Sequence, residues 1–192
     1  MAKSPSVLLL IPAYNEEERI GPVLRDYAEY FRKNYDGEFR AVVVLNGCRD
    51  NTLGVVEEVA VEYQEIEPLN FPDPIGKGGA LIDGFKKAAE AQAVLTGYVD
   101  ADGATPPSAF HELVKQCAAG EADCLIGSRW LPGAVLHQSQ TRLRRIFSRG
   151  FHTIVGALFW MGIRDTQCPA KVMRRKAVEK ILESLRIADL AF

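Results

Sequence analysis

The stretch Val94-Leu-Thr-Gly-Tyr-Val-Asp-Ala-Asp-Gly-Ala-Thr-Pro-Pro107 decides how the rest of the chain is interpreted. Residues 94–99 are rich in apolar, β-branched and aromatic side chains, which is typical of a buried strand. Asp100 and Asp102 follow that strand, at the place where open α/β sheets bind ligands. Because Mg²⁺ takes oxygen ligands from one or two carboxylates and from substrate phosphates, a nucleotide diphosphate is the first ligand to consider. An Asp-Gly turn with two solvated acids would show the same residues, so the remaining sequence has to decide.

Other strand-like runs alternate with helix-like segments on both sides of this stretch. The aliphatic runs 7–11 and 41–45 are typical of buried strands. Residues 123–126 indicate a further strand, and 66–71 a weaker strand interrupted by Pro68. This alternation predicts an α/β fold with a mostly parallel sheet and helices on both faces. The polar or glycine-rich segments that follow four of the strands would then meet at one edge of the sheet: 13–16, 46–50, 100–102 and 127–129.

Composition limits the classes of protein that need to be considered. The chain has 192 residues, a charged fraction of 25% and a formal net charge of -2, as expected for one globular domain. The small net charge argues against a general nucleic-acid binder. The four cysteines are scattered and the N-terminal segment does not resemble a signal peptide, so we expect reduced cysteines in a cytosolic chain. No run of about 20 apolar residues occurs, so we expect no spanning helix.

Motifs spread over nearly the whole chain resemble one family. Their order and spacing are similar to those of the family-two, GT-A-fold glycosyltransferases, and among these to the polyprenyl-phosphate (dolichyl-phosphate) sugar transferases. The wording of the Asp100 and Asp165 motifs is most similar to the dolichyl-phosphate glucosyltransferase branch. The motifs are Ile11-Pro-Ala-Tyr-Asn-Glu16, Asn46-Gly-Cys-Arg-Asp-Asn-Thr52, Gly76-Lys-Gly78, Asp100-Ala-Asp102, Gly127-Ser-Arg129 and Asp165-Thr-Gln-Cys168.

The resemblance implies an activity and a division of the chain. It implies a metal-dependent, inverting glycosyltransferase that moves a sugar, glucose from UDP-glucose in this branch, to a polyprenyl or dolichyl phosphate. A single domain, 1–192, would hold a nucleotide-sugar-binding half, 1–127, and an acceptor-binding half, 128–192, which ends abruptly, as a truncated chain would. Three alternatives stay open: a soluble hydroxyl acceptor with Asp165 as the base, mannose from GDP-mannose, and a nucleotide-sugar-binding protein without catalysis.

The resemblance also implies roles for individual residues. Mg²⁺ or Mn²⁺ would be held by Asp100 and Asp102, and Asp102, Arg129 and Asp165 would be catalytic. Asn46 departs from the family pattern, which often has paired acids here, and an amide donates as well as accepts hydrogen bonds. Ala104 stands where mannosyl relatives often have Gln. The nucleotide sugar would be contacted by Pro12, Tyr14, Glu16, Asn46, Lys77, Asp100 and Ala101.

The acceptor phosphate sets a different requirement from a hydroxyl acceptor. A phosphate monoester is mostly dianionic at neutral pH, so it needs positioning and no general base. Arginine suits this task because its planar guanidinium binds phosphate through two hydrogen bonds. Arg129 follows a strand directly, and Arg144 with Ser148 matches the family's Arg-x-x-x-Ser acceptor-phosphate element. Arg145 and Arg149 are alternatives to Arg144. The same arginines would also occur in the solvated first turn of a basic helix that binds no phosphate.

The apolar segment 151–163 has two interpretations. It fits an ordinary core helix, and equally an amphipathic element at the surface of a membrane that holds the lipid substrate. The expected partners are therefore a nucleotide sugar, a polyprenyl-phosphate lipid and a membrane surface, with no nucleic acid. The expected location is cytoplasmic, peripheral at the cytoplasmic face of a membrane. We expect His111 on a surface helix with a structural role, and give His137 little weight.

Overall fold

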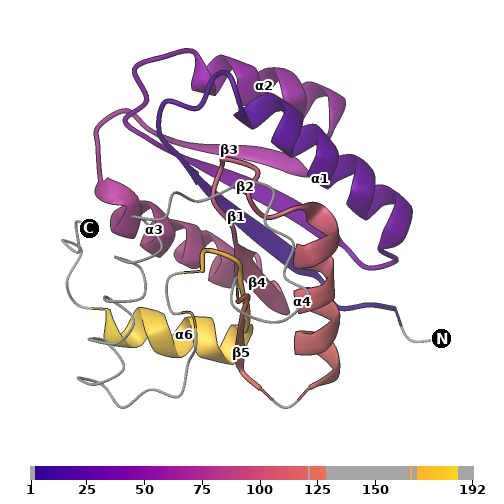
Figure 1. The fold of residues 1–192 in the computed structure, drawn as a ribbon. Coiled ribbons are helices and arrows are strands. Elements are labelled where there is room, and N and C mark those ends of the chain that lie inside the picture. Colours follow the sequence, from indigo (N-terminus) through magenta and orange to yellow (C-terminus); the bar gives the residue numbers. More distant parts are fainter. Residues whose placement is uncertain (1–2, 121, 129–164, 166–167, 186–192) are drawn as a thin grey trace, which may run out of the picture.

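The computed structural model describes residues 3–120, 122–128, 165 and 168–185 (Figure 1). Within these ranges six strands form one sheet in the order β3-β2-β1-β4-β6-β5. The first four strands in the chain run parallel to one another, and β6 runs antiparallel to both β4 and β5. The prediction of a mostly parallel sheet is therefore confirmed. The strands are β1 (Val7–Ala13), β2 (Phe39–Asn46), β3 (Ile66–Phe71), β4 (Leu95–Tyr98), β5 (Cys124–Ile126) and β6 (Lys171–Arg174).

Helices cover both faces of the sheet (Figure 1). One face packs against α1, α2 and α4, and the other against α3 and α6. Successive residues of β1 alternate between the two layers: Leu9 and Ile11 join the first, Leu8 and Leu10 the second. Both faces are buried, which explains why β1 and β2 read as continuous aliphatic runs. The helices are α1 (Ile20–Asn34), α2 (Thr52–Glu62), α3 (Gly76–Glu90), α4 (Pro107–Ala119) and α6 (Arg175–Ser184).

Strand β4 passes very close to a helix, and a glycine makes this possible. A Cβ atom added at Gly97 would lie 2.5 Å from the ring of Phe110 and 2.8 Å from the backbone oxygen of Lys171. Phe110 belongs to α4 and is fully buried. Glycine at this position therefore allows α4 and β6 to approach the strand that leads into Asp100.

Two prolines do not interrupt the sheet as the sequence suggested. Strand β1 continues through Pro12 to Ala13, and β3 continues through Pro68, because β3 is an edge strand where a missing N–H is tolerated. Asn15 does not cap α1, which begins at Ile20 after Arg19. Asn15 instead has a left-handed backbone (φ 54°), and its side-chain oxygen accepts a hydrogen bond from the Arg49 N–H at 2.8 Å.

No helix in the described ranges has the length and apolar character that crossing a membrane requires.

Candidate functional site

A cavity of about 360 Å³ opens at the carboxyl edge of the sheet. It lies where the segments after β1, β2 and β4 meet the first turn of α3. These are three of the four segments that were predicted to converge; Gly127 and Ser128 of the fourth do not line the cavity. The pocket includes every residue that was predicted to contact the nucleotide sugar, and also Asp102. Two further residues, Ala13 and Arg19, were not predicted. The lining consists of Pro12, Ala13, Tyr14, Glu16, Arg19, Asn46, Lys77, Asp100, Ala101 and Asp102.

Lys77 and Asp100 form an ion pair inside this cavity. The Lys77 Nζ lies 2.6 Å from Asp100 Oδ1, with side chains 53% and 31% exposed, so the pair remains open to exchange with an incoming ligand. Asp102 is held differently, because its Oδ1 accepts a hydrogen bond from the Ala104 N–H at 2.9 Å. This short turn fixes the carboxylate next to the end of β4.

Arg19 forms the second ion pair of the cavity. Its Nε and Nη2 both contact Oε2 of Glu16, at 2.8 and 2.7 Å. No bond to the other carboxylate oxygen of Glu16 occurs within the described residues, which leaves that oxygen as an acceptor for a ligand hydroxyl or N–H. The i, i+3 spacing of Glu16 and Arg19 is visible in the sequence, but such pairs are common on helix surfaces and gave no reason to assign Arg19 to the site.

The loops after β1 and β2 are joined by hydrogen bonds around a buried threonine. Thr52 Oγ1 accepts a bond from the Glu16 N–H at 2.8 Å and donates to Asp50 Oδ1 at 2.5 Å. Asp50 Oδ2 accepts from the Glu17 N–H at 3.2 Å, and Glu17 Oε2 accepts from the Asn51 N–H at 2.7 Å. These bonds hold the backbone of Glu16 in place, and with it the carboxylate that lines the cavity.

The same hydrogen bonds affect the titration of Asp50. Desolvation alone would raise the pKa of this carboxyl, but the bonds from the Thr52 hydroxyl and from the N–H groups of Thr52 and Glu17 stabilise the charged form. The net result is an Asp50 pKa below its usual value. Asp50 is therefore a charged component of the loop junction at neutral pH.

The donor set of the cavity fits a hard divalent cation only in part. In the described part of the chain no group of three or more His, Cys, Asp or Glu side chains could hold a metal ion. Asp100 and Asp102 alone are too few for a closed protein site, but they suit an ion that takes its other oxygens from water and a diphosphate. The cavity contains three carboxylates and two cationic side chains, one net negative charge. A dianionic diphosphate would therefore be repelled unless a cation accompanied it.

Several predicted residues fall where the structure gives no description. Arg129, Arg144 and Ser148, the predicted acceptor-phosphate residues, lie outside the described residues, as do Arg145, Arg149, His137 and the segment 151–163. Their roles remain predictions.

Asp165 is described and is buried, with 4% of its surface exposed. It does not line the cavity. Cys168 is tied to the sheet by Lys171, whose Nζ donates to the Cys168 carbonyl and contacts the Tyr98 hydroxyl, both at 2.7 Å. The catalytic role of Asp165 thus stays a prediction.

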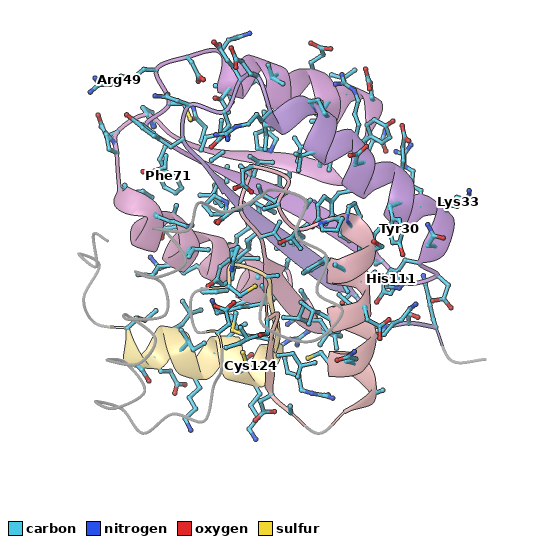
Figure 2. All side chains as sticks on the ribbon, in the orientation of Figure 1. Tyr30, Lys33, Arg49, Phe71, His111 and Cys124 are labelled. Carbon is cyan, nitrogen blue, oxygen red and sulfur yellow. The ribbon has the colours of Figure 1, made fainter. Side chains whose placement is uncertain are left out.

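The expectation for His111 was half wrong. His111 is only 5% exposed, so it lies on the buried side of α4 and not on a surface. Its Nδ1 is 3.3 Å from the Tyr30 hydroxyl, and Figure 2 shows the two side chains adjacent between α1 and α4. Burial lowers the pKa of His111.

The fold is that of the GT-A glycosyltransferases, as the resemblance predicted. The chain belongs to glycosyl transferase family 2, because the model of that family, "Glycosyl transferase family 2", matches residues 8–182.

Curated relatives place the chain within this family. It is 34% identical over 194 residues to a dolichyl-phosphate beta-glucosyltransferase of Trichomonas vaginalis, covering 97% of this chain and 58% of the relative. It is 30% identical to the dolichyl-phosphate beta-glucosyltransferase of Saccharomyces cerevisiae, covering 96% and 59%. It is also 31% identical to glycosyltransferase AglD of Haloferax volcanii, covering 96% and 29%. The chain thus spans less than two thirds of the length of these relatives.

Solved structures support the fold at lower identity. Glucosyl-3-phosphoglycerate synthase from Mycobacterium tuberculosis, in complex with Mn²⁺, uridine diphosphate and glucosyl-3-phosphoglycerate, matches with a TM-score of 0.62 and 20% identity, covering 90% of this chain and 57% of that one. Mannosyl-3-phosphoglycerate synthase from Rubrobacter xylanophilus matches with a TM-score of 0.66 and 15% identity, covering 90% and 54%.

Proposed function

We propose that this chain transfers glucose from UDP-glucose to a polyprenyl phosphate of the dolichyl type, with inversion at the anomeric carbon. The observation that carries the proposal is a cavity that is lined by Asp100, Asp102 and Lys77 together with Glu16 and Asn46. Relatives about 30% identical to the chain are named dolichyl-phosphate beta-glucosyltransferases, which supports the choice of sugar and acceptor.

The cavity offers separate groups for the two ends of a nucleotide sugar. Along the β1 and β2 strand ends the lining includes Tyr14, with half of its surface exposed, and the polar side chains of Glu16 and Asn46, which suit a base and a ribose. After β4 come Asp100, which pairs with Lys77, and Asp102; these groups suit a diphosphate with its cation. The nucleoside would then lie over the ends of β1 and β2, and the diphosphate at the end of β4.

The transfer itself needs little acid–base chemistry. An oxygen of the acceptor phosphate uses a lone pair to form a bond with the anomeric carbon, and the bond from that carbon to the diphosphate oxygen breaks, leaving its electron pair on the diphosphate. Attack from the face opposite the leaving group inverts the anomeric centre. The acceptor is already anionic at neutral pH, so no side chain has to remove a proton from it.

The chief task of the site is to stabilise charge on the departing diphosphate. Mg²⁺ or Mn²⁺ held by Asp100 and Asp102 would supply Lewis-acid stabilisation of that leaving group. Lys77 is a second positive charge within the cavity and can move from Asp100 to a phosphate oxygen without crossing a buried region. Arg129, Arg144 and Ser148 are the proposed ligands of the acceptor phosphate, and Asp165 is proposed to orient one of them or the sugar.

The lipid acceptor implies where the reaction takes place. We propose that the chain works at the cytoplasmic face of a membrane, bound peripherally, because a polyprenyl chain stays in the bilayer while its phosphate reaches the surface. The basic and apolar sequence between Arg142 and Ile163 supports this placement.

The proposal is tested by measuring transfer of labelled glucose from UDP-glucose to a polyprenyl phosphate. The lipid is embedded in vesicles, and the protein and Mn²⁺ are in the surrounding buffer. Parallel reactions replace UDP-glucose by GDP-mannose, and the lipid by a soluble hydroxyl acceptor. We expect a lipid-linked product only with the phosphate lipid, and a β configuration of that product. Nucleotide binding without turnover on either acceptor would instead indicate a binding protein.

Two aspartate variants make the assay specific for the cavity. Asp102→Asn keeps an oxygen that accepts the Ala104 N–H and removes only the charge. Losing an electrostatic contribution of several kcal/mol should lower the rate about 100-fold or more. Asp83→Asn is the matched control, because Asp83 pairs with Lys86 on the surface of α3, away from the cavity. Equal activity of the two variants would contradict the assignment of Asp102.

A further inference from the structure

Asn46 is the residue of the cavity whose chemistry the sequence left undecided. It ends β2 and lines the cavity at the place proposed for the base. A carboxylate at this position would only accept hydrogen bonds, whereas an amide offers a donor on one side and an acceptor on the other. Whether the amide nitrogen or the amide oxygen of Asn46 faces a ligand depends on what the other atom contacts.

The structure fixes the orientation of this amide. The Ile75 backbone N–H donates to Asn46 Oδ1 at 2.7 Å. A backbone N–H can only donate, so the side-chain atom that faces Ile75 has to be the oxygen. If the amide turned over, two N–H groups would face each other and the Ile75 donor would lose its partner, at a cost of about 1–3 kcal/mol.

The backbone around Asn46 reinforces this orientation. The Gly47 N–H donates to the Phe71 carbonyl at 2.9 Å, and Gly47 has a left-handed backbone (φ 64°). A Cβ at Gly47 would lie 2.7 Å from the backbone nitrogen of Pro74. The segment 71–75 is thus seated closely against Asn46 and Gly47, and the Ile75 N–H cannot move away from the amide on its own.

The nitrogen of the same amide is available to a ligand. Asn46 Nδ2 has no hydrogen bond to any part of the chain that the structure describes. In that same part, no side-chain nitrogen or oxygen is fully buried without a partner. Nδ2 therefore remains accessible, and the accessible region beside Asn46 is the cavity that it lines.

We infer that Asn46 recognises a hydrogen-bond acceptor on the nucleobase, a ring carbonyl oxygen, and that it does not bind a ring N–H. The inference rests on the proposed function, because it requires a nucleotide in this cavity. Uracil offers two carbonyl oxygens, O2 and O4, and the amide donates to one of them. Asn46 is thus a specificity-determining residue whose hydrogen-bonding role is the reverse of that of an acidic residue.

Replacing single oxygen atoms of the base by sulfur tests this directly, since sulfur is a weak hydrogen-bond acceptor. Dissociation constants of UDP, 2-thio-UDP and 4-thio-UDP are measured by calorimetry with Mn²⁺, for the full chain and for Asn46→Asp. Aspartate at this position keeps an acceptor for the Ile75 N–H and exchanges the donor for a second acceptor. Asn70→Asp is the matched control, because Asn70 is an exposed residue of β3 that does not line the cavity. Asn46→Ala serves as a second donor-free variant.

One thio analogue should bind about threefold to tenfold more weakly than UDP to the wild type and to Asn70→Asp, the value of one neutral hydrogen bond. In Asn46→Asp and Asn46→Ala this ratio should fall to about one. Comparing ratios within each protein removes the effect of the added negative charge on diphosphate binding. If the ratio of the two dissociation constants were the same in the wild type and in both Asn46 variants, the inference would be overturned. The proposed function would remain intact in that case, provided that the wild type binds UDP. A wild type that binds no UDP would overturn both.

Discussion

Thr52→Val should weaken the site and the fold together, because Thr52 is the buried point at which two loops are joined. The substitution keeps the shape of the side chain and removes only the hydroxyl, which is fully buried. The Glu16 N–H then loses its acceptor, at a cost of about 1–3 kcal/mol, and the charged Asp50 loses a donor worth about 1.5–3 kcal/mol. Water can reach the half-buried Asp50 and offsets part of this loss, so we expect unfolding to become easier by about 2–4 kcal/mol.

Thr52→Ser is the matched control. It retains the hydroxyl and loses one methyl group, which should cost about 1 kcal/mol. Urea unfolding at pH 7 measures both variants, and UDP binding is measured beside it. Only the valine variant should bind UDP more weakly even when it is fully folded, because only in that variant does the Glu16 N–H lose its hydrogen bond.

The effect of pH gives a second measurement on the same pair. The pKa of Asp50 is lowered in the folded state, so its contribution to stability is present above the unfolded pKa, near 3.9, and is lost as pH falls through the folded pKa. In Thr52→Val the Asp50 pKa should return toward its ordinary value. The difference in stability between the valine and serine variants should therefore be largest near neutral pH and shrink in acid. The reasoning would be refuted by a stability difference that stays the same from pH 7 down to about pH 2, well below the unfolded pKa, or by a valine variant that is as stable as the serine variant.

Three other outcomes are expected. Gly97→Ala should destabilise the fold by about 1–3 kcal/mol or more in urea unfolding, since the new methyl group would lie 2.5 Å from Phe110; unchanged stability would show that α4 can move away. Burial lowers the pKa of His111, so the folded state resists protonation of this side chain. The free energy of unfolding should therefore fall as pH drops below the unfolded pKa near 6.5. Melting curves from pH 8 to pH 5 should show this dependence in the wild type and not in His111→Gln. Lys77→Ala should raise the affinity of the nucleotide-free protein for Mn²⁺ by up to about fivefold, the value of a partly exposed ion pair, and should lower the affinity for UDP. Lys77→Arg should change neither affinity. Electron paramagnetic resonance of free Mn²⁺ measures the metal affinity of the two variants.

The sheet and the main lining of the cavity were predictable because the relevant signals are local. Continuous aliphatic runs identify β1 and β2 as buried parallel strands, and in such a sheet the residues after each strand have to meet at one edge. Asp100 and Glu16 could therefore be predicted to lie at the same edge of the sheet, although 84 positions separate them in the sequence.

Two of the features that escaped prediction depend on long-range contacts. Asn15 looks like a helix cap because a capping side chain and one that bonds to a distant loop are the same residue type, and only the Arg49 N–H decides between them. The sequence around Lys171 shows a strand, but not that the strand enters the sheet antiparallel between β4 and β5. Arg19 was missed because its ion pair with Glu16 would also occur on any exposed helix start.

The two ends of the cavity differ in how firmly their side chains are held, and this difference bears on how the site works. At the proposed base end, two groups have fixed partners outside the cavity: Asn46 has the Ile75 N–H, and the Glu16 backbone has Thr52. At the diphosphate end, Lys77 is half exposed and its partner Asp100 belongs to the cavity itself. Groups that are already held cost little entropy on binding, so the base end is suited to selection. The diphosphate end must exchange partners as charge develops, so substitutions there should alter the rate more than the choice of nucleotide.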